Sequence, residues 1–273
     1  MAGTLALLLL AALGVMALAM TLAWVLARRT GSHGWVDTVW SFAVGLTAVT
    51  LALLPLTPES PTLRQIVVAA AAGLWSLRLG SHILARTLKG GDDPRYAELV
   101  REWGPSAPSR LFLFLQIQAV CGLILAGAVM AAAHAPMPFG SVWDILGLLV
   151  IVVAVAGEGL ADRQLAAFRA NPSNRGKVCD VGLWGVSRHP NYFFEWMAWV
   201  AYPLFAIDTG GDYLVGYAAL AGPALMYWLL VHASGIPPTE AHMLRSRGDA
   251  FRAYMARVNS FWPGPPKKPG RGR

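Results

Sequence analysis

Charge and cysteine are both scarce in this chain of 273 residues. Only 14% of the residues are charged, whereas soluble domains carry about 25%, so an ordinary soluble domain is excluded. The two cysteines, Cys121 and Cys179, lie in an apolar run and in a basic loop. This number and placement predict neither a disulfide framework nor a zinc site. The six histidines are scattered along the chain, so we expect no metal centre.

Apolar sequence is abundant instead, at 56% of the chain. It comes in runs of about 20 residues, the length of helix that spans the hydrocarbon core of a membrane. We therefore predict an all-α polytopic helix bundle, integral to the membrane, with one domain over 1–262 and a disordered basic tail over 263–273. About seven spans are expected, near 4–27, 35–55, 65–86, 111–133, 142–160, 191–208 and 213–232.

The distribution of basic residues predicts the topology. Arginines and lysines crowd alternate connections and the tail, and the other connections are nearly free of them. The positive-inside rule then places the amino terminus outside and the carboxyl terminus in the cytoplasm. This topology explains the net charge of +7 without a nucleic-acid partner. The run over 4–27 lacks a basic segment before it and a clear cleavage site after it, so we interpret it as a retained span.

One later segment, 238–261, is amphipathic rather than spanning. Apolar residues such as Met243, Phe251 and Tyr254 recur near helical spacing between arginines. This pattern predicts a cytoplasmic helix on the membrane surface or folded back over the bundle. Two interpretations remain open, an interfacial anchor and a functional lid.

Ionisable residues lie near the ends of several predicted spans, namely Asp37, Arg78, Glu158 and Glu195. Such residues are costly in lipid and usually face the protein interior or a cavity. They could form buried ion pairs that fix the helix register, or they could line a cavity open to the cytoplasm. Glu158 shares a helix face with Asp162, four residues further on.

The connection over 161–192 combines cations with asparagines and turn-forming glycines. Arginine forks suit phosphate oxygens, and asparagine suits amide or adenine edges. A generic basic loop is the alternative. No GxGxxG follows a strand, which excludes a Rossmann domain, so a bound nucleotide would enter the helix bundle itself.

Four segments together resemble the DUF1295 family of bacterial membrane proteins: GWVDTVWSF, LWSLRLGSH, NPSNRGKVCDVGLWGVSRHPNYFFEW and EAHMLRSRGDAFRAYMARVNSFWP. That family is related to the steroid 5α-reductases and, more distantly, to sterol reductases and isoprenylcysteine carboxyl methyltransferases. The resemblance implies a bacterial inner-membrane location and about seven spans. It also implies NADPH held between the cytoplasmic halves of the helices, facing a pocket open to the bilayer.

The resemblance also assigns residues. Arg78, Asp162, Arg169, Asn191 and Glu195 match positions of the reductases' cofactor site. With the composition of the connecting loop, the predicted NADPH-binding set is Arg78, Glu158, Asp162, Arg169, Asn174, Arg175, Lys177, Arg188, His189, Asn191, Tyr192 and Glu195.

Asp37 falls where the reductases place a glutamate that meets the substrate carbonyl, and Trp75 stands where they have the partner tyrosine. We therefore assign Asp37 and Trp75 as the catalytic residues. Reduction of an enone builds charge on the carbonyl oxygen, which needs a donor. The Trp75 indole can donate a hydrogen bond but cannot release a proton. We expect Asp37 to act alone, kept protonated by apolar surroundings.

The resulting hypothesis is a membrane-embedded NAD(P)H-dependent reductase of a lipophilic unsaturated substrate that enters from the bilayer. Two alternatives remain, a methyltransferase that uses S-adenosylmethionine and a non-catalytic lipid-binding protein. The charge of the cofactor distinguishes the reductase from the methyltransferase, because NADPH carries several phosphate charges and S-adenosylmethionine carries no phosphate. The cluster of Arg163, Arg169, Arg175 and Lys177 favours NADPH.

Overall fold

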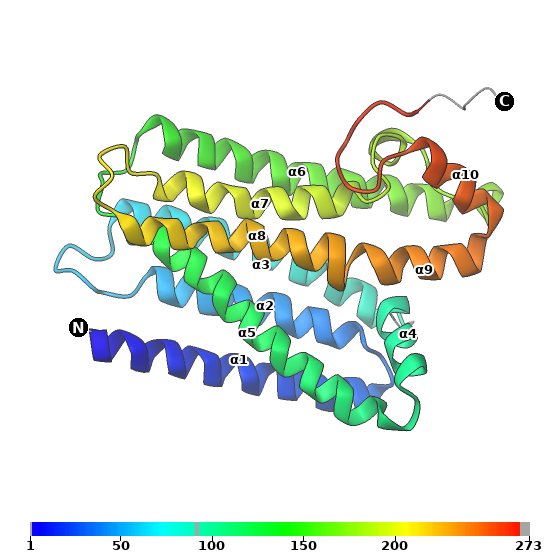
Figure 1. The fold of residues 1–273 in the computed structure, drawn as a ribbon, viewed down its shortest axis with the longest axis horizontal. Helices are drawn as coiled ribbons and strands as arrows, with labels where there is room; N and C mark the ends of the chain where they lie inside the picture. The colour runs from blue at the N-terminus through cyan, green and yellow to red at the C-terminus, as the bar shows by residue number, and fades with distance from the viewer. Residues whose placement is uncertain (1, 91–92, 268–273) are drawn as a thin grey trace. The chain divides into compact units, whose positions relative to one another are not determined.

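The structure is a computed structural model that describes residues 2–90 and 93–267, and throughout these ranges the regular elements are helical (Figure 1). The longer helices are α1 (Ala2–Thr30), α2 (Gly34–Ala52), α3 (Leu63–Leu88), α5 (Ala107–Ala133), α6 (Val142–Ala170) and α7 (Pro190–Ala206). The shorter ones are α4 (Pro94–Trp103), α8 (Ala221–Trp228), α9 (Ile236–Arg247) and α10 (Asp249–Arg257). Turns of 3-10 helix cover Gly104–Ser106, Pro172–Asn174, Gly182–Gly185 and Leu214–Leu220, and a π-helical turn covers Leu229–Ala233.

The prediction of an all-α membrane protein is confirmed. Six helical stretches of the described chain are long and apolar enough to cross a membrane: Gly3–Thr30, Gly34–Ala52, Leu63–Leu88, Arg95–Ala133, Val142–Ala170 and Leu214–Arg247. They agree with six of the expected spans. The remaining expected span, 191–208, corresponds to α7, which has 17 residues and contains Pro203.

Two predicted boundaries need correction. The span expected over 142–160 continues as helix to Ala170, so the first part of the supposed connection over 161–192 belongs to α6. The amphipathic segment over 238–261 is two helices, because Gly248 separates α9 from α10 with a φ of 50° that favours glycine. Residues 268–273, most of the predicted disordered tail, lie outside the described residues.

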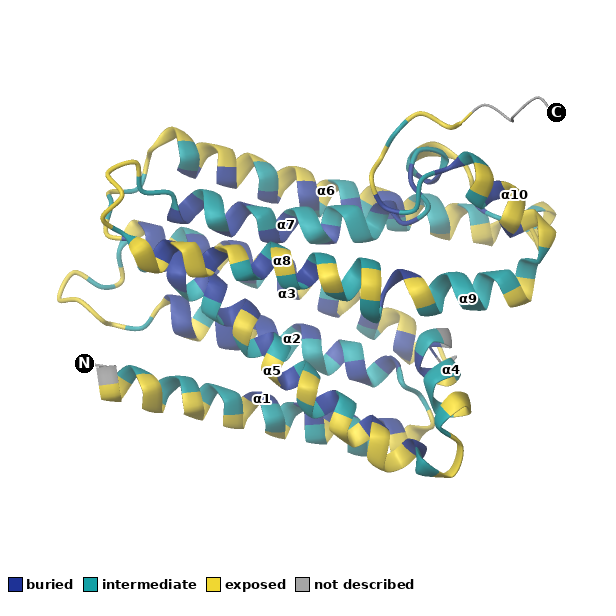
Figure 2. Ribbon diagram, in the orientation of Figure 1, coloured by how far each residue is buried: buried dark blue, intermediate teal, exposed yellow. Residues whose placement is uncertain are grey.

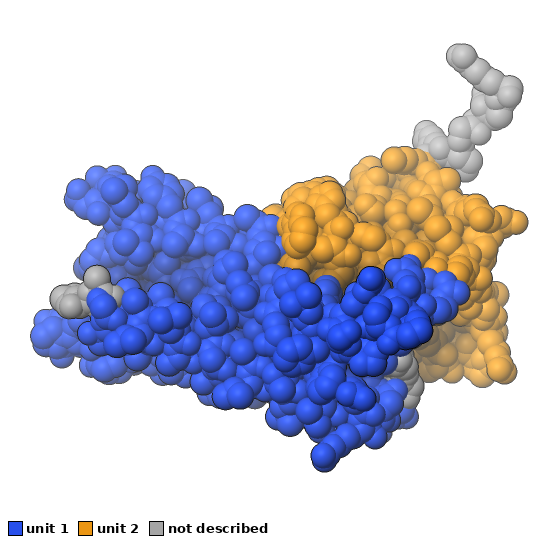
Figure 3. All heavy atoms as spheres, turned by 60° about the horizontal axis from the view of Figure 1, so that its bottom comes forward, with its two compact units in different colours: residues 1–148, 200–225 blue, residues 149–199, 226–273 orange. Residues whose placement is uncertain are grey.

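The chain divides into two compact units, which are described separately (Figure 3). Unit 1 comprises Met1–Leu148 and Val200–Leu225, and unit 2 comprises Leu149–Trp199 and Met226–Arg273. The prediction of one domain over 1–262 stays a prediction.

In unit 1, α2 packs against α1, α3 and α5 (Figure 1). Small residues permit the closest approach: a Cβ on Gly45 would lie 2.1 Å from the side chain of Ser76, and one on Gly80 would lie 2.7 Å from the ring of Phe42. Close backbone contact through small residues is the usual way in which membrane helices associate. The outer surface of α1 exposes leucines, as a lipid-facing helix does (Figure 2). This packing fixes the position of the α2 end that carries Asp37.

In unit 2, the parts of α6 and α7 that belong to the unit pack through Gly157, where a Cβ would lie 2.4 Å from the ring of Phe194. The connection after α6 is held to that helix, because the Trp184 indole donates to the Ala161 carbonyl at 2.9 Å. Phe251 and Tyr254 of α10 form a small core with Val258, which follows the helix. The Tyr254 hydroxyl donates to the carbonyl of Trp184, so the carboxyl-terminal segment is folded onto the same connection.

Candidate functional site

The first candidate site, in unit 1, is built around the Asp37 carboxylate in the first turn of α2. Arg95 of α4 forms an ion pair with Asp37 Oδ2, and the Tyr96 hydroxyl donates to Asp37 Oδ1 at 2.8 Å. Gln118 of α5 donates from Nε2 to the Tyr96 oxygen at 3.1 Å. Because Gln118 supplies a hydrogen to that oxygen, the tyrosine's own proton points at Asp37. The cluster therefore consists of the Asp37 carboxyl group with a phenol and a guanidinium as its donors.

The start of α4 places the two donors. Asp93 caps the helix by accepting from the Arg95 backbone N–H at 3.0 Å, and a proline occupies the first turn. Asp93 also binds the side chains of Arg95 and Arg86, at 2.9 Å and 2.8 Å. Burial alone would raise the pKa of Asp93, but the two guanidiniums outweigh it and hold that pKa well below its usual range. Asp93 is thus a fixed anion that orients Arg95 toward Asp37.

Asp37 is not alone in the structure, because Arg95 and Tyr96 both bind its carboxylate, and its expected role as a protonated acid stays a prediction. The tyrosine that binds the Asp37 carboxylate is Tyr96 of α4. Trp75 is buried, with its ring edge-on to Trp40 at 6.4 Å. The assignment of Trp75 as a catalytic residue stays a prediction.

Most of the predicted cofactor residues lie in unit 2, where Arg188 is the most extensively bonded. Its Nε and Nη2 donate to the two oxygens of Glu240 at 2.8 Å and 3.2 Å, and its Nη1 donates to the carbonyls of Val258 and Met255 at 2.5 Å and 3.3 Å. The Arg188 side chain is 9% exposed. Arg188 therefore joins α9 to the segment after α10, and most of its donors serve the protein itself.

His189 extends this network. Its Nε2 lies 3.0 Å from Glu240 Oε1, and its ring stacks on Tyr192 with centroids 5.3 Å apart. The Tyr192 hydroxyl lies 3.4 Å from the hydroxyl of Thr239 in α9. Burial lowers the pKa of His189 below its usual value, and the contact with Glu240 offsets only part of that effect. The predicted trio of Arg188, His189 and Tyr192 thus does come together, with Glu240 and Thr239 as partners.

The other predicted cofactor residues divide by exposure. Asn174 donates to the Phe168 carbonyl at 3.0 Å, and buried Glu195 accepts from the Trp199 indole at 3.2 Å. Asn191 is half-buried at the start of α7. Glu158 is buried and Asp162 is half-buried, one turn apart on α6, while Arg78 is half-buried on α3 of unit 1. Exposed cations of the set are Arg169, Arg175 and Lys177.

These contacts decide how far the set fits a phosphate-bearing cofactor. The exposed cations Arg175 and Lys177 can reach phosphate oxygens from solvent. Arg188, His189 and Asn174 instead hold the fold together through the bonds given above. Arg175 and Lys177 therefore have the exposure and charge that a phosphate needs, whereas Arg188, His189 and Asn174 support the surrounding fold.

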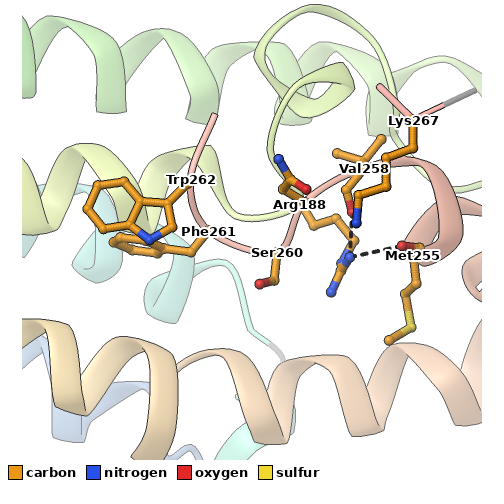
Figure 4. A pocket seen from close by; sticks show the side chains of 8 residues that line it. Arg188, Met255, Val258, Ser260, Phe261, Trp262 and Lys267 are labelled. Atoms are coloured by element: carbon orange, nitrogen blue, oxygen red, sulfur yellow. Dashed lines mark hydrogen bonds between the residues drawn. The ribbon is translucent and has the colours of Figure 1, made fainter. Parts of the chain in front are cut away.

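A pocket of about 410 Å³ lies in unit 2 beside this network (Figure 4). Its lining residues are Arg188, Met255, Val258, Asn259, Ser260, Phe261, Trp262 and Lys267. Figure 4 shows the Arg188 guanidinium with its bonds to the Met255 and Val258 carbonyls. Arg188 is the member of the predicted cofactor set that lines this pocket.

The predicted site residues lack several members of these clusters, among them Arg95, Tyr96 and Glu240. The signal for the first two was the stretch Asp93-Pro94-Arg95-Tyr96, which reads as a helix cap followed by proline. This stretch marks the start of a helix, but it does not show that Arg95 and Tyr96 contact Asp37, which lies far away along the chain. Glu240 is the one acidic residue close to the start of the amphipathic segment, a pattern that gives no partner.

Comparison with known sequences supplies a family but no activity. The family model described as "Protein of unknown function (DUF1295)" matches residues 23–258. No curated protein and no solved structure matches the chain.

Proposed function

Because the chain belongs to the DUF1295 family, whose description assigns no activity, we propose a function from the two sites themselves. The protein is a membrane-embedded NAD(P)H-dependent reductase of a lipophilic unsaturated carbonyl compound. The single observation that carries this proposal is the Tyr96 hydroxyl 2.8 Å from Asp37 Oδ1.

The chemistry of this pair suits a carbonyl oxygen that gains charge. An enolate oxygen needs a hydrogen-bond donor placed before the reaction begins. The Tyr96 hydroxyl can donate one hydrogen bond, and its oxygen already accepts one from Gln118. When the hydroxyl turns from Asp37 to the substrate oxygen, Arg95 still balances the Asp37 charge. Tyr96 is then the donor, and Asp37 and Gln118 hold it in position.

NADPH supplies the hydride in this proposal. The chain's own contribution to binding is the exposed positive charge of Arg175 and Lys177, together with the loop that Arg188 and His189 stabilise. Arginine forks bind phosphate in a bidentate manner and lysine acts as a point charge.

The membrane completes the proposal. A lipophilic substrate enters from the bilayer, and the distribution of basic residues supports an amino terminus outside and a carboxyl terminus in the cytoplasm of a bacterial inner membrane. The soluble cofactor then comes from the cytoplasm.

One observation favours a second candidate, a methyltransferase that uses S-adenosylmethionine. Glu240 neutralises Arg188 in a bidentate ion pair, which reduces the positive charge available to bind phosphates. S-adenosylmethionine has no phosphate and does not need that charge. A non-catalytic lipid-binding protein is the third candidate, and it predicts that neither nucleotide binds.

Thermal unfolding of the detergent-purified protein with NADPH, NADH and S-adenosylmethionine distinguishes the three candidates. A ligand at a hundredfold excess over its dissociation constant stabilises by about 2.7 kcal/mol. We expect NADPH to raise Tm, and the double variant Arg175→Gln/Lys177→Gln to lose most of that rise. Stabilisation by S-adenosylmethionine alone would replace the reductase with the methyltransferase. No stabilisation by any of them would leave the lipid-binding candidate.

A further inference from the structure

The pocket in unit 2 has a defined construction that the proposed reduction does not use. Apart from Arg188, every lining residue comes from the segment 255–267 (Figure 4). Backbone bonds hold that segment in place: Gly264 N–H donates to the Val186 carbonyl at 3.0 Å, and Lys267 N–H donates to the Arg257 carbonyl at 2.7 Å. The Ser187 hydroxyl adds a bond to the Phe261 carbonyl at 2.9 Å. The wall of the pocket is therefore anchored at several points.

Lys267 gives the pocket its positive charge, because Glu240 neutralises Arg188. Arg188 and Lys267 both line it, and the lining residues include no carboxylate. The Glu240 contacts fix the direction of the Arg188 guanidinium. Lys267 is exposed and brings an ammonium group with three donors. Asn259 and Ser260 add an amide and a hydroxyl. An ammonium group beside neutral donors suits a phosphate group.

One wall is aromatic. The Trp262 side chain is 50% exposed although it belongs to a cluster of rings. Its centroid lies 5.1 Å from that of Trp196 and 6.1 Å from that of Tyr227, with Phe261 at 5.2 Å. Tryptophan is enriched at the level of the lipid headgroups, where its apolar ring and polar N–H meet both environments. An exposed tryptophan beside an ammonium group therefore matches a molecule with a charged head and an apolar body.

We propose that this pocket binds the phosphate group of an anionic phospholipid headgroup. Lys267 neutralises the phosphate, Asn259 and Ser260 donate hydrogen bonds, and Trp262 contacts the glycerol and the first acyl carbons. A soluble phosphate ester has the same head without the apolar body, so the test below separates the two sources. The inference is independent of the proposed reduction.

The test measures lipid binding to the full-length protein by native mass spectrometry, with phosphatidylglycerol and phosphatidylcholine offered in equal amounts. The variant is Lys267→Gln, and the matched control is Lys177→Gln. Both remove one exposed lysine charge from unit 2, and only Lys267 lines the pocket. The Tm of each variant reports whether it folds as the wild type does.

We expect the wild type to prefer phosphatidylglycerol and Lys267→Gln to bind it about fivefold more weakly, the effect of one basic residue near an anionic surface. Lys177→Gln should keep wild-type lipid binding. Equal losses of lipid binding in both variants would overturn the proposal, because they would show a general attraction of anionic lipid to basic residues. Equal binding of the two lipids by the wild type would also overturn it.

Competition identifies the source of the phosphate, with inorganic phosphate and glycerol phosphate as soluble probes. Failure of both probes to displace the lipid supports the lipid headgroup. Displacement by either probe at a concentration equal to that of the lipid would overturn the lipid assignment in favour of a soluble phosphate. NADPH binding measured on the same variants keeps the two proposals apart, since Lys267→Gln should leave it unchanged.

Discussion

Removal of the Tyr96 hydroxyl should separate the role of the unit 1 cluster from its contribution to the fold. Tyr96→Phe loses the bond to Asp37 at 2.8 Å and the bond from Gln118 at 3.1 Å. Asp37 keeps Arg95 as a partner, so the loss at that end is a net hydrogen bond of about 1 kcal/mol. Gln118 Nε2 loses its acceptor in a part-buried position, which costs about 1 kcal/mol more. The expected destabilisation is therefore about 2 kcal/mol.

The matched control is Tyr213→Phe. Tyr213 belongs to the same unit, and its hydroxyl donates to the Ala131 carbonyl at 2.8 Å. This variant should be destabilised by about 1 kcal/mol and should keep the activity of the wild type. Tyr96→Phe should lose in addition a factor of about 100 to 1,000 in kcat, as when one donor to a developing oxyanion is removed.

Stability is measured by denaturant unfolding in detergent, and activity by consumption of NADPH with a lipophilic enone. A Tyr96→Phe protein that unfolds earlier but keeps kcat within about tenfold of wild type would refute the reasoning, because the hydroxyl would then be only structural.

Two further variants test the packing and the pH dependence. Gly45→Ala should lower the unfolding free energy by about 1 to 3 kcal/mol, because its Cβ would lie 2.1 Å from the Ser76 side chain. The control Gly127→Ala, whose Cβ would have nothing within 4 Å, should be neutral or stabilising in the same unfolding assay. Equal effects of the two variants would contradict the close approach of α2 and α3. His189 is expected to make the protein less stable as the pH falls below 6.5, because burial lowers its folded-state pKa beneath that usual value and the unfolded chain then binds the extra proton. Full stability is present above pH 6.5, and the Tm of His189→Gln should fall less on acidification than that of the wild type; parallel Tm curves would count against the assignment.

The helical framework could be predicted from sequence because it depends on local composition. Runs of apolar residues long enough for a membrane span predicted where six helical stretches lie along the chain. The ends of helices were less predictable. The α6 helix continues to Ala170 through a polar sequence, which a hydropathy criterion reads as a connection. The break at Gly248 depends on a single left-handed residue within an amphipathic pattern.

The sites were predictable only in part, because they depend on contacts between distant segments. Asp37 was identified as an unusual acid in an apolar context, but its donors come from α4, whose start is marked only by a helix cap. Arg188 was identified as a cofactor residue, which stays a prediction, and its ion pair with Glu240 was not anticipated. Its position beside Glu240 and the carbonyls after α10 makes it a support for the loop, and no spacing in the sequence shows that α9 and α10 fold back onto it.

The most direct test of the proposed reductase compares NADPH oxidation with product formation in a single vessel. Purified protein receives NADPH and a lipophilic enone, and both the oxidised cofactor and the saturated ketone are quantified for the wild type and for Tyr96→Phe. The proposal predicts one saturated ketone for each NADPH oxidised by the wild type, and a rate for Tyr96→Phe that is lower by about 100-fold or more. Cofactor oxidation with no saturated product, or equal product from both proteins, would contradict it.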